Sequence, residues 1–245
     1  MYTTYTVDAM KISLRKTSLV DYPGKIAGAL FFPGCNLRCP WCHNRELVLF
    51  DRKQMDKLVA IDDVLRYLEK RRPVLGGVVL SGGESTLYRE LPSLIRRIKK
   101  LGLSVKIDTN GMNPGMLEQL VHDRDTMPDY IALDLKVAPR RYALLALHNP
   151  GDPAKKLEES AALIRSSPVP HEFRTLVFPR EFITPLDIES LAPLVDDAPW
   201  YFRLFRPGNC LDPAWDNLEP AELTAAQALA ERAQALGKQG IYAGK

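Results

Sequence analysis

The chain has 245 residues, of which 46% are hydrophobic and 26% are charged, and its formal net charge is +3. This composition is ordinary for a globular protein and supplies enough apolar residues for a sizeable core. A net charge of +3 is too small to indicate a nucleic acid or an anionic membrane as a partner. The sequence also lacks an apolar run of the ~20 residues that span a bilayer. We therefore expect neither a nucleic-acid partner nor a membrane partner.

The start of the chain is polar and has neither the basic first residues nor the apolar core of a signal peptide. The chain has four cysteines, three of them in one cluster, which fits a reducing compartment better than a secreted one. We therefore expect a cytoplasmic protein in which residues 1–10 form a loose extension.

Short apolar segments rich in β-branched and aromatic residues recur along the chain and predict six strands. In chain order, the predicted strands are 27–32, 77–81, 103–108, 130–135, 173–178 and 200–205.

Segments of helical periodicity lie between these predicted strands. The apolar positions 61, 64, 65 and 68 repeat with helical spacing and end before a proline at 73. A second helix is predicted over 91–101, with Pro92 in its first turn and Gly102 just past its end. Asp152 and Pro153 are the predicted N-cap and first residue of a third helix, and the last one spans 220–236.

Six strands that alternate with helices predict parallel βαβ units and an α/β fold. A complete eightfold barrel needs about 250 residues of repeats alone, whereas part of this chain forms an N-terminal segment and a cysteine-rich loop. We therefore predict a partial (βα)6 barrel, TIM-like and open on one side. A flat doubly wound sheet is the competing architecture. No long linker or repeat interrupts the sequence, so residues 1–245 are expected to form a single domain.

Three of the four cysteines, Cys35, Cys39 and Cys42, lie within eight residues, and Cys210 stands alone. Thiolates on one short loop suit a soft centre, either zinc or an iron–sulfur cluster. Three ligands leave one coordination position open for chemistry. The structural alternative is a zinc knuckle in which the neighbouring His43 is the fourth ligand. We interpret Cys210 as a small buried hydrophobic residue and not as a ligand.

Polar motifs follow four consecutive predicted strands, at the ends where parallel α/β sheets carry their functional loops. The cysteine loop follows the first strand, and the next three strands end in the motifs 81–84 (Ser-Gly-Gly-Glu), 108–111 (Asp-Thr-Asn-Gly) and 134–136 (Asp-Leu-Lys). Each motif has a structural explanation when taken alone, because glycine, aspartate and asparagine are common turn residues. The charges at 134 and 136 share one face of a strand, where burial is costly unless they are paired or bind a ligand. Together the four motifs predict a ligand site.

The Cys-x3-Cys-x2-Cys pattern followed by a Gly-Gly-Glu strand end resembles the radical S-adenosylmethionine (radical SAM) superfamily. The resemblance implies that the three cysteines hold three irons of one [4Fe–4S] cluster, while the fourth iron chelates S-adenosylmethionine. It also implies that Trp41 packs near the adenine and that Gly82, Gly83 and Glu84 meet the methionyl amino group. Ser85 stands where this family usually has proline.

Residues 17–25, together with the Cys-His-Asn sequence at 42–44, resemble the glycyl-radical-enzyme activating enzymes. Among them the chain is most similar to the anaerobic ribonucleoside-triphosphate reductase activating proteins. This resemblance implies that Asp108, Asp134, Lys136 and Arg174 contact the cofactor. It further implies a monovalent cation site formed by Asp108, Thr109 and Asp134. No cysteine occurs between 43 and 80, so a single cluster is expected.

The activity implied by the resemblance is reductive cleavage of S-adenosylmethionine to a 5′-deoxyadenosyl radical. That radical abstracts a hydrogen atom from a glycine of a partner glycyl radical enzyme, of the anaerobic ribonucleotide reductase type. A flavodoxin or ferredoxin-type protein is the expected electron donor, and no side chain is expected to act as a catalytic acid or base. Two alternatives stay open: a radical SAM enzyme acting on a small molecule such as a deazapurine precursor, and a non-catalytic zinc or iron–sulfur module.

Overall fold

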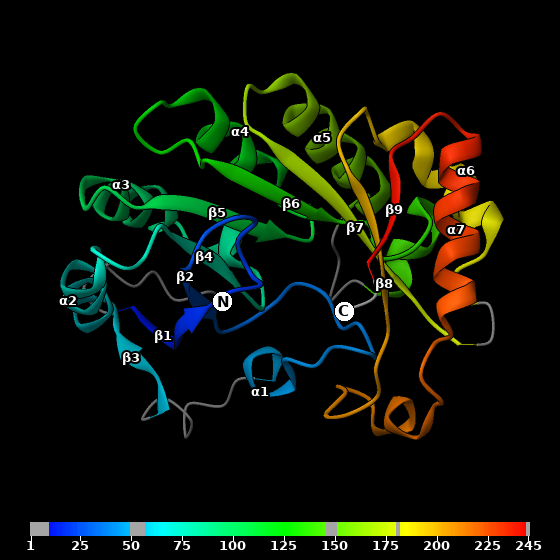
Figure 1. The fold of residues 1–245 in the computed structure, drawn as a ribbon, viewed down its shortest axis with the longest axis horizontal. Coiled ribbons are helices and arrows are strands. Elements are labelled where there is room, and N and C mark those ends of the chain that lie inside the picture. The colour runs from blue at the N-terminus through cyan, green and yellow to red at the C-terminus, as the bar shows by residue number, and fades with distance from the viewer. Residues whose placement is uncertain (1–9, 50–56, 146–150, 180–181, 244–245) are drawn as a thin grey trace. The chain divides into compact units, whose positions relative to one another are not determined.

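The structure is a computed structural model that describes residues 10–49, 57–145, 151–179 and 182–243 (Figure 1). The chain forms two compact units. The N-terminal unit comprises Met1–Cys35, Glu46–Thr109 and Gly115–Ile131, and the C-terminal unit comprises Asn36–Arg45, Asn110–Pro114 and Ala132–Lys245. The single domain expected from the sequence therefore stays a prediction. Most of the expected loose extension lies outside the described residues, and its last residue, Met10, is buried in the core.

Within the described residues, nine strands form a mostly parallel sheet in the order β3-β1-β2-β4-β5-β6-β7-β8-β9. The strand β6 (Tyr130–Asp134) begins in the N-terminal unit and ends in the C-terminal unit. Because β3 and β9 stand at the two ends of this order, the sheet is not closed into a barrel. The predicted α/β class with an open, largely parallel sheet is confirmed.

The N-terminal unit contains three of the six predicted strands and two that the sequence did not predict. Its strands are β1 (Lys11–Ser18), β2 (Ala27–Phe32), β3 (Val59–Ala60), β4 (Gly77–Gly82) and β5 (Ser104–Thr109). The predicted strands β2, β4 and β5 pair in parallel, whereas β1 is antiparallel to β2 and to β3. The sequence missed β1 because it is charged and partly exposed, and β3 because it has only two residues.

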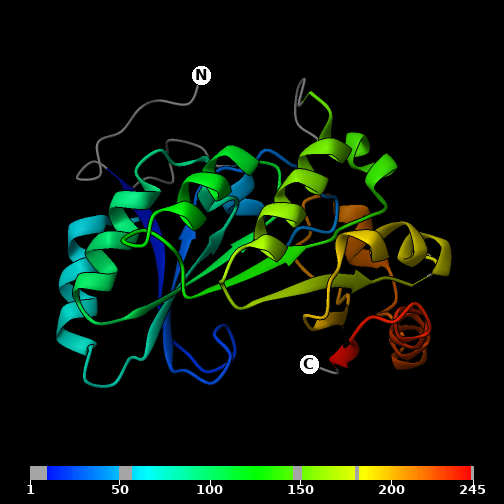
Figure 2. The same ribbon diagram turned by 90° about the horizontal axis from the view of Figure 1, so that it is seen from above.

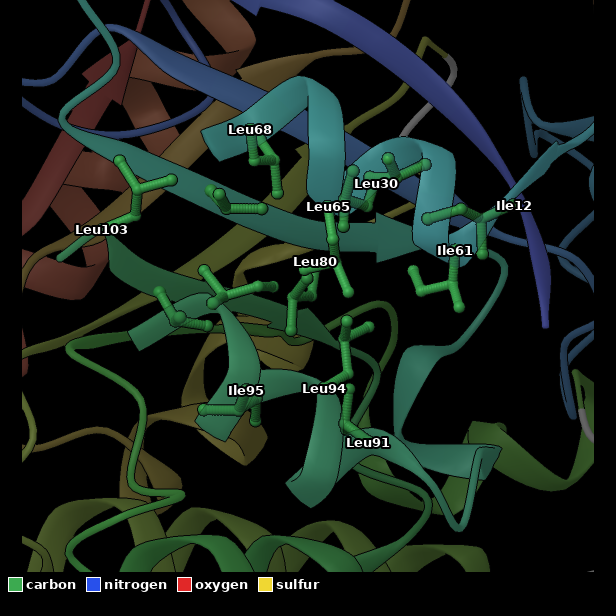
Figure 3. Close-up of a cluster of buried hydrophobic side chains, with 14 of the residues drawn as sticks. Ile12, Leu30, Ile61, Leu65, Leu68, Leu80, Leu91, Leu94, Ile95 and Leu103 are labelled. Carbon is green, nitrogen blue, oxygen red and sulfur yellow. The ribbon is translucent and has the colours of Figure 1, made fainter. Parts of the chain in front are cut away.

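Three helices pack leucine and isoleucine side chains into the core of the N-terminal unit: α2 (Ile61–Arg71), α3 (Leu91–Lys100) and α4 (Pro114–His122), whose first residue belongs to the C-terminal unit. The N-terminal unit also contains the 3-10 helix Ser85–Leu87 and all but the first residue of the short helix α1 (Arg45–Val48). Figure 3 shows Leu65 and Leu94, from α2 and α3, in the same apolar cluster as Leu30 and Leu80 from β2 and β4. Full burial of each such side chain stabilises the fold by about 1.5–3 kcal/mol.

The C-terminal unit repeats the same strand and helix alternation. Its strands β7 (His171–Val177), β8 (Trp200–Leu204) and β9 (Gly240–Ala243) are parallel neighbours. Its helices are α5 (Pro153–Ser166), α6 (Pro185–Leu191) and α7 (Leu223–Ala235), with 3-10 helices at Pro139–Leu144, Ala192–Leu194 and Pro213–Asn217. Figure 2 shows α7 beside β9, the short last strand that the sequence did not predict.

Local capping confirms the predicted start of α5. The side chain of Asp152 accepts a hydrogen bond from the backbone N–H of Lys155 at 3.1 Å, and Pro153 is the first helical residue. The helix α6 begins in the same manner, since Thr184 and Asp187 form a reciprocal capping box. These caps satisfy backbone donors that a helix start would otherwise leave unpaired.

Gly82 and Gly83, at the end of β4, allow the backbone there to pack directly against the segment that follows β2. The N–H of Gly83 donates to the carbonyl oxygen of Phe32 at 2.8 Å, and the N–H of Glu84 donates to that of Gly34 at 2.9 Å. A Cβ atom at Gly83 would lie 1.9 Å from the carbonyl oxygen of Gly34. Gly82 has a φ of +112°, and a Cβ atom there would lie 2.2 Å from the backbone nitrogen of Phe32. Side chains at these positions would therefore displace the segment that leads into Cys35.

We predict that Gly83→Ala destabilises the chain by about 3 kcal/mol, because a backbone oxygen cannot move aside as a flexible side chain can. The matched control is Gly115→Ala in α4, where an added Cβ atom meets nothing within 4 Å. The control should be neutral or more stable by up to about 1 kcal/mol, since alanine is the better helix former. Thermal unfolding of the two variants measures the difference, and equal stability would contradict the close-approach explanation.

Candidate functional site

The residues predicted to form the site are divided between the two units. The N-terminal unit holds Cys35, Gly82, Gly83, Glu84, Asp108 and Thr109, and the C-terminal unit holds Cys39, Trp41, Cys42, Asp134, Lys136 and Arg174. Gly82, Asp108, Thr109 and Asp134 lie at the carboxyl ends of their strands, as the sequence predicted, and Gly83, Glu84 and Lys136 follow within two residues of a strand end. Arg174 lies in the middle of β7 (His171–Val177), and the cysteines belong to the longer segment that follows β2.

In the N-terminal unit, Glu84 is a buried hydrogen-bond acceptor that joins the ends of β4 and β5. Its side chain is 1% exposed. One carboxylate oxygen, Oε1, accepts from the hydroxyl of Thr86 at 2.7 Å, from the backbone N–H of Thr86 at 3.2 Å and from the hydroxyl of Thr109 at 2.9 Å. The structure thus brings together two predicted site residues, Glu84 and Thr109.

Asp108, also in the N-terminal unit, is paired with a lysine that the sequence reasoning did not single out. The ammonium of Lys106 lies 2.6 Å from Oδ1 of Asp108, and it also donates to the carbonyl oxygen of Asp21 at 3.0 Å. Both side chains come from β5 and are two residues apart, so they share a face of the strand. The spacing of Lys106 and Asp108 is visible in the sequence, but the sequence alone does not indicate that the two side chains are paired.

In the C-terminal unit, Asp134 lies between two cations. Its Oδ1 accepts from Nε of Arg174 at 2.7 Å, and its Oδ2 accepts from Nζ of Lys136 at 3.1 Å. Burial raises the pKa of the Asp134 carboxyl, but the charges of Arg174 and Lys136 outweigh it and hold that pKa below its usual range. Burial lowers the pKa of Lys136, and the charges of Asp134 and Cys39 more than reverse that effect. Asp134 and Lys136 are therefore ionised at neutral pH, as arginine always is, and the three charges are paired. Because β6 ends at Asp134, Lys136 lies two residues past the strand, contrary to the prediction from the sequence that it lies on it.

Tyr142 fixes the backbone that carries this network, and the sequence reasoning missed it. Its hydroxyl donates to the carbonyl oxygen of Asp134 at 3.1 Å and accepts from the backbone N–H of Lys136 at 2.8 Å. The side chain is fully buried, and burial raises the pKa of its phenol. A tyrosine eight residues after an aspartate gives no recognisable pattern, so only the fold reveals this role.

A pocket of about 200 Å³ lies within the C-terminal unit, next to this network. It is lined by Trp41, Asp134, Leu135, Lys136, Arg174, Thr175, Leu176 and Arg203. Four of the predicted cofactor-binding residues therefore share one pocket. Its volume is below the roughly 300–1,000 Å³ of complete small-molecule sites. The sequence did not indicate Arg203, because no polar motif follows its strand, β8.

Trp41 forms the aromatic wall of this pocket and is held by other aromatic rings. Its ring centroid lies 4.7 Å from that of Phe178, 5.2 Å from that of Trp215 and 5.3 Å from that of Phe182. Trp41 is 3% exposed. Rings packed at these distances and inclined to one another hold the indole in one orientation.

The cysteine loop presents Cys39 and Cys42 on a single turn, in which the N–H of Cys42 donates to the carbonyl oxygen of Cys39 at 3.0 Å. All four cysteines are among the described residues, and none of them is in a disulfide bond. Asn110 donates to the side chain of Asn36 at 2.8 Å and so ties the motif after β5 to this loop. The free thiols on one turn, with Cys39 beside the positive charge of Lys136, fit thiolate ligands of a soft metal centre.

As they are placed, the described residues contain no group of three or more cysteine, histidine, aspartate or glutamate side chains that could hold a metal ion. Cys35 belongs to one unit, and Cys39 and Cys42 belong to the other. The three-cysteine ligand set therefore stays a prediction.

Cys210 is completely buried, as the sequence reasoning expected. Burial and a hydrogen bond to the side chain of Asp216 raise the pKa of its thiol to about 11. The backbone N–H of Cys210 also donates to Asp216, at 2.9 Å. At neutral pH this cysteine is a protonated thiol, which is the inert form.

Among the residues that the structure describes, no helix is long and apolar enough to cross a membrane.

Comparison with known proteins assigns the chain to a family. The family profile of the radical SAM superfamily matches residues 30–188. A protein of Methanocaldococcus jannaschii that carries the name of a glycyl-radical enzyme activating enzyme is 30% identical over 205 residues, which are 82% of each chain. A pyruvate formate-lyase-activating enzyme of Clostridium pasteurianum is 33% identical over 129 residues, about half of each chain.

Among solved structures, a radical SAM methyltransferase from Sphaerobacter thermophilus has the same fold. It aligns with a TM-score of 0.69 over 91% of this chain and 67% of its own length, at 13% sequence identity. At this low sequence identity, the structural similarity is evidence about the fold alone. It confirms the predicted partial barrel open on one side.

The chain thus belongs to the radical SAM superfamily, and within it to the glycyl-radical-enzyme activating enzymes. Membership implies a [4Fe–4S] cluster and S-adenosylmethionine as cofactors, and it makes the chain an enzyme. The alternative of a non-catalytic zinc or iron–sulfur module is therefore wrong.

We predict that Asp134→Asn lowers the free energy of unfolding at pH 7 by about 2–3 kcal/mol, because it leaves Arg174 and Lys136 without their shared carboxylate. The pKa of Asp134 is lowered by folding, so its contribution is present above its ordinary value of 3.8 and is lost as the pH falls through the folded value. The difference between wild type and variant should therefore shrink below about pH 4.

Urea unfolding of the cluster-free chain between pH 3 and 7 measures this difference. The control Asp63→Asn removes one partner of an exposed pair with Arg66, and we expect a change of at most about 0.5 kcal/mol. A difference for Asp134→Asn that stays constant down to pH 3 would show that its carboxylate is not the source of the stability.

We predict that Cys210 is the last of the four cysteines to be alkylated by iodoacetamide in the folded, cluster-free chain at pH 7.5. Its thiol is buried and its pKa is about 11, so the reactive thiolate is scarce. Mass spectrometry of timed samples gives the order of labelling, and the same reaction in denaturant should label all four. Equal rates for Cys210 and the partly exposed Cys42 in the folded chain would contradict the prediction.

Proposed function

We propose that the pocket of the C-terminal unit binds part of S-adenosylmethionine and that the chain activates a glycyl radical enzyme of the anaerobic ribonucleotide reductase type. The observation that carries the proposal is the wall of this pocket. It combines Trp41, which lies between two of the predicted cluster ligands, with the ionised groups of Asp134, Lys136 and Arg174.

The chemistry of the pocket suits a ligand with an aromatic base and a carboxylate. The indole of Trp41, fixed by neighbouring rings, offers a flat apolar surface for the adenine. Lys136, Arg174 and Arg203 supply three positive charges, and Asp134 and Glu172 supply two negative charges, because Glu172 lies 3.9 Å from both arginines. The five groups therefore carry a net positive charge. That charge favours the carboxylate of the methionyl part.

The N-terminal unit supplies the groups proposed to meet the methionyl amino group. Gly82 and Gly83 are needed for the close approach of the β2 and β4 loops, so their proposed contact with the cofactor is through backbone atoms. Glu84 uses Oε1 for its threonine partners, and an ionised carboxylate has further lone pairs with which to accept from an ammonium. Cys35, Cys39 and Cys42 are the proposed ligands of the cluster.

Held by Cys35, Cys39 and Cys42, a bound cluster would supply the single electron for reductive cleavage of the S–C5′ bond of S-adenosylmethionine, with methionine as the leaving group and a glycine of the protein substrate as the source of the hydrogen atom. The chain's own residues bind and orient these groups and keep water from them, and no side chain acts as an acid or a base. We propose a flavodoxin or ferredoxin-type protein of the cytoplasm as the electron donor.

The proposed partner is supported by the segment 17–25, whose sequence is similar to that of the ribonucleotide reductase activating proteins. This segment begins in the last two residues of β1 and exposes two adjacent apolar side chains, Leu19 at 73% and Val20 at 81%, while Tyr22 is buried at 4%. A loop anchored by one buried aromatic residue and presenting two apolar residues suits contact with another protein.

We predict that anaerobic reconstitution with iron, sulfide, reductant and S-adenosylmethionine yields 5′-deoxyadenosine and methionine, and that Cys39→Ala loses both the cluster absorption and the products. Cys210→Ser is the matched control and should keep both, because that thiol is not a proposed ligand. Full cleavage activity in Cys39→Ala would remove Cys39 from the ligand set. Addition of the reductase should produce a glycyl radical signal, and a signal only with another glycyl radical enzyme would refute the proposed partner.

A further inference from the structure

Lys106 is a charged side chain inside the sheet of the N-terminal unit. It lies on β5, between the buried residues Val105 and Ile107, and is itself only 2% exposed. A buried ammonium is costly unless it is paired and hydrogen-bonded, and lysine is almost never fully buried without a partner. The position of Lys106 therefore requires an explanation.

The partners of Lys106 are one carboxylate and one backbone oxygen. Its ammonium lies 2.6 Å from Oδ1 of Asp108, whose side chain is 16% exposed, and 3.0 Å from the carbonyl oxygen of Asp21. Asp21 lies between β1 and β2, in the segment 17–25. One ammonium thus neutralises the carboxylate at the end of β5 and also fixes that segment.

The same carboxylate was predicted to be one of three ligands of a monovalent metal cation. The other two predicted ligands are also engaged. The hydroxyl of Thr109 donates to Glu84 at 2.9 Å, and Asp134, in the other unit, is bonded to Arg174 and Lys136. Each predicted carboxylate ligand thus already has a cation that belongs to the chain, and this donor set does not fit a metal ion.

We propose that the ammonium of Lys106 is the built-in counter-ion of Asp108 and takes the place of a monovalent metal cation. Lysine is a compact point charge with three donors, so it can bond Asp108 and Asp21 together much as a small cation would bridge two oxygens. The chain therefore binds its cofactor equally well with or without K⁺ or Na⁺. This inference rests on the proposed function only because both concern the carboxyl end of β5.

Ion binding to the wild-type full chain is the first test, measured before and after cluster reconstitution. Thallium-205 NMR, with Tl⁺ as a probe for K⁺, should show no saturable binding. The midpoint of thermal unfolding should be equal in KCl, NaCl and choline chloride at the same ionic strength. Saturable Tl⁺ binding that K⁺ displaces and that Asp108→Asn abolishes would overturn the proposal.

The second test removes the ammonium. Lys106→Met leaves Asp108 without its cation, so this variant should bind Tl⁺ saturably and should melt at a higher temperature in KCl than in choline chloride. The double variant Lys106→Met/Asp108→Asn should lose that response, and Lys99→Met, which removes a more exposed partner of Asp129, should never show it. A folded Lys106→Met that binds no Tl⁺ would overturn the proposal. If Lys106→Met does not fold, the measurement of Tl⁺ binding to the wild-type chain still decides whether the proposal holds.

The affinity for S-adenosylmethionine separates this inference from the proposed function. Isothermal titration of the reconstituted wild type should give dissociation constants that agree within about twofold in KCl and in choline chloride, a difference below about 0.4 kcal/mol. A tenfold tighter constant in KCl would contradict the inference. Absence of binding in both salts would contradict the proposed function, and the Tl⁺ measurement would still decide the role of Lys106.

Discussion

The pairing of carboxylates at the ends of buried parallel strands is the constraint on which the site depends. Water is largely excluded there, so an ionised group without a partner would destabilise the fold. The chain meets this requirement with Lys106, from the same strand as Asp108, and with Lys136, just past the strand of Asp134, together with Arg174 from β7. These contacts give each buried carboxylate at least one cation as a partner, and the second cation beside Asp134 leaves positive charge at the pocket. Stability and function thus rest on the same contacts.

The second constraint is the close packing of two backbone segments, the end of β4 and the segment after β2. This packing determines where the cysteine loop begins. The loop starts where the segment after β2 runs against the end of β4, and a Cβ atom on Gly83 would collide with the carbonyl oxygen of Gly34. The glycine pair therefore has a structural role before any cofactor binds. The Asn110–Asn36 hydrogen bond of 2.8 Å fixes a later part of the same loop to the motif after β5. Motifs that are distant in sequence act on one loop, which explains their occurrence on successive strands.

Much of this fold could be predicted from the sequence because apolar periodicity marks buried strands and helices strongly. All six central strands were predicted to within about two residues, and Asp152 was correctly identified as a helix cap. The strands β1, β3 and β9 were missed because they are charged, very short or at the end of the sheet. The motif residues Asp134, Lys136, Arg174 and Trp41 do share one pocket. Lys106, Tyr142 and Arg203 were not foreseen, since their partners are defined by the fold and not by spacing.

The proposed activity of this chain is to take a hydrogen atom from a glycine of an anaerobic ribonucleotide reductase with the help of S-adenosylmethionine. Isotope transfer tests it most directly. The reductase is prepared with deuterium at the α-carbon of its glycines, and the reconstituted chain is allowed to act on it with S-adenosylmethionine and reductant. The account predicts 5′-deoxyadenosine that carries one deuterium, formed together with a glycyl radical in the reductase. Unlabelled 5′-deoxyadenosine with no radical in the reductase would contradict it.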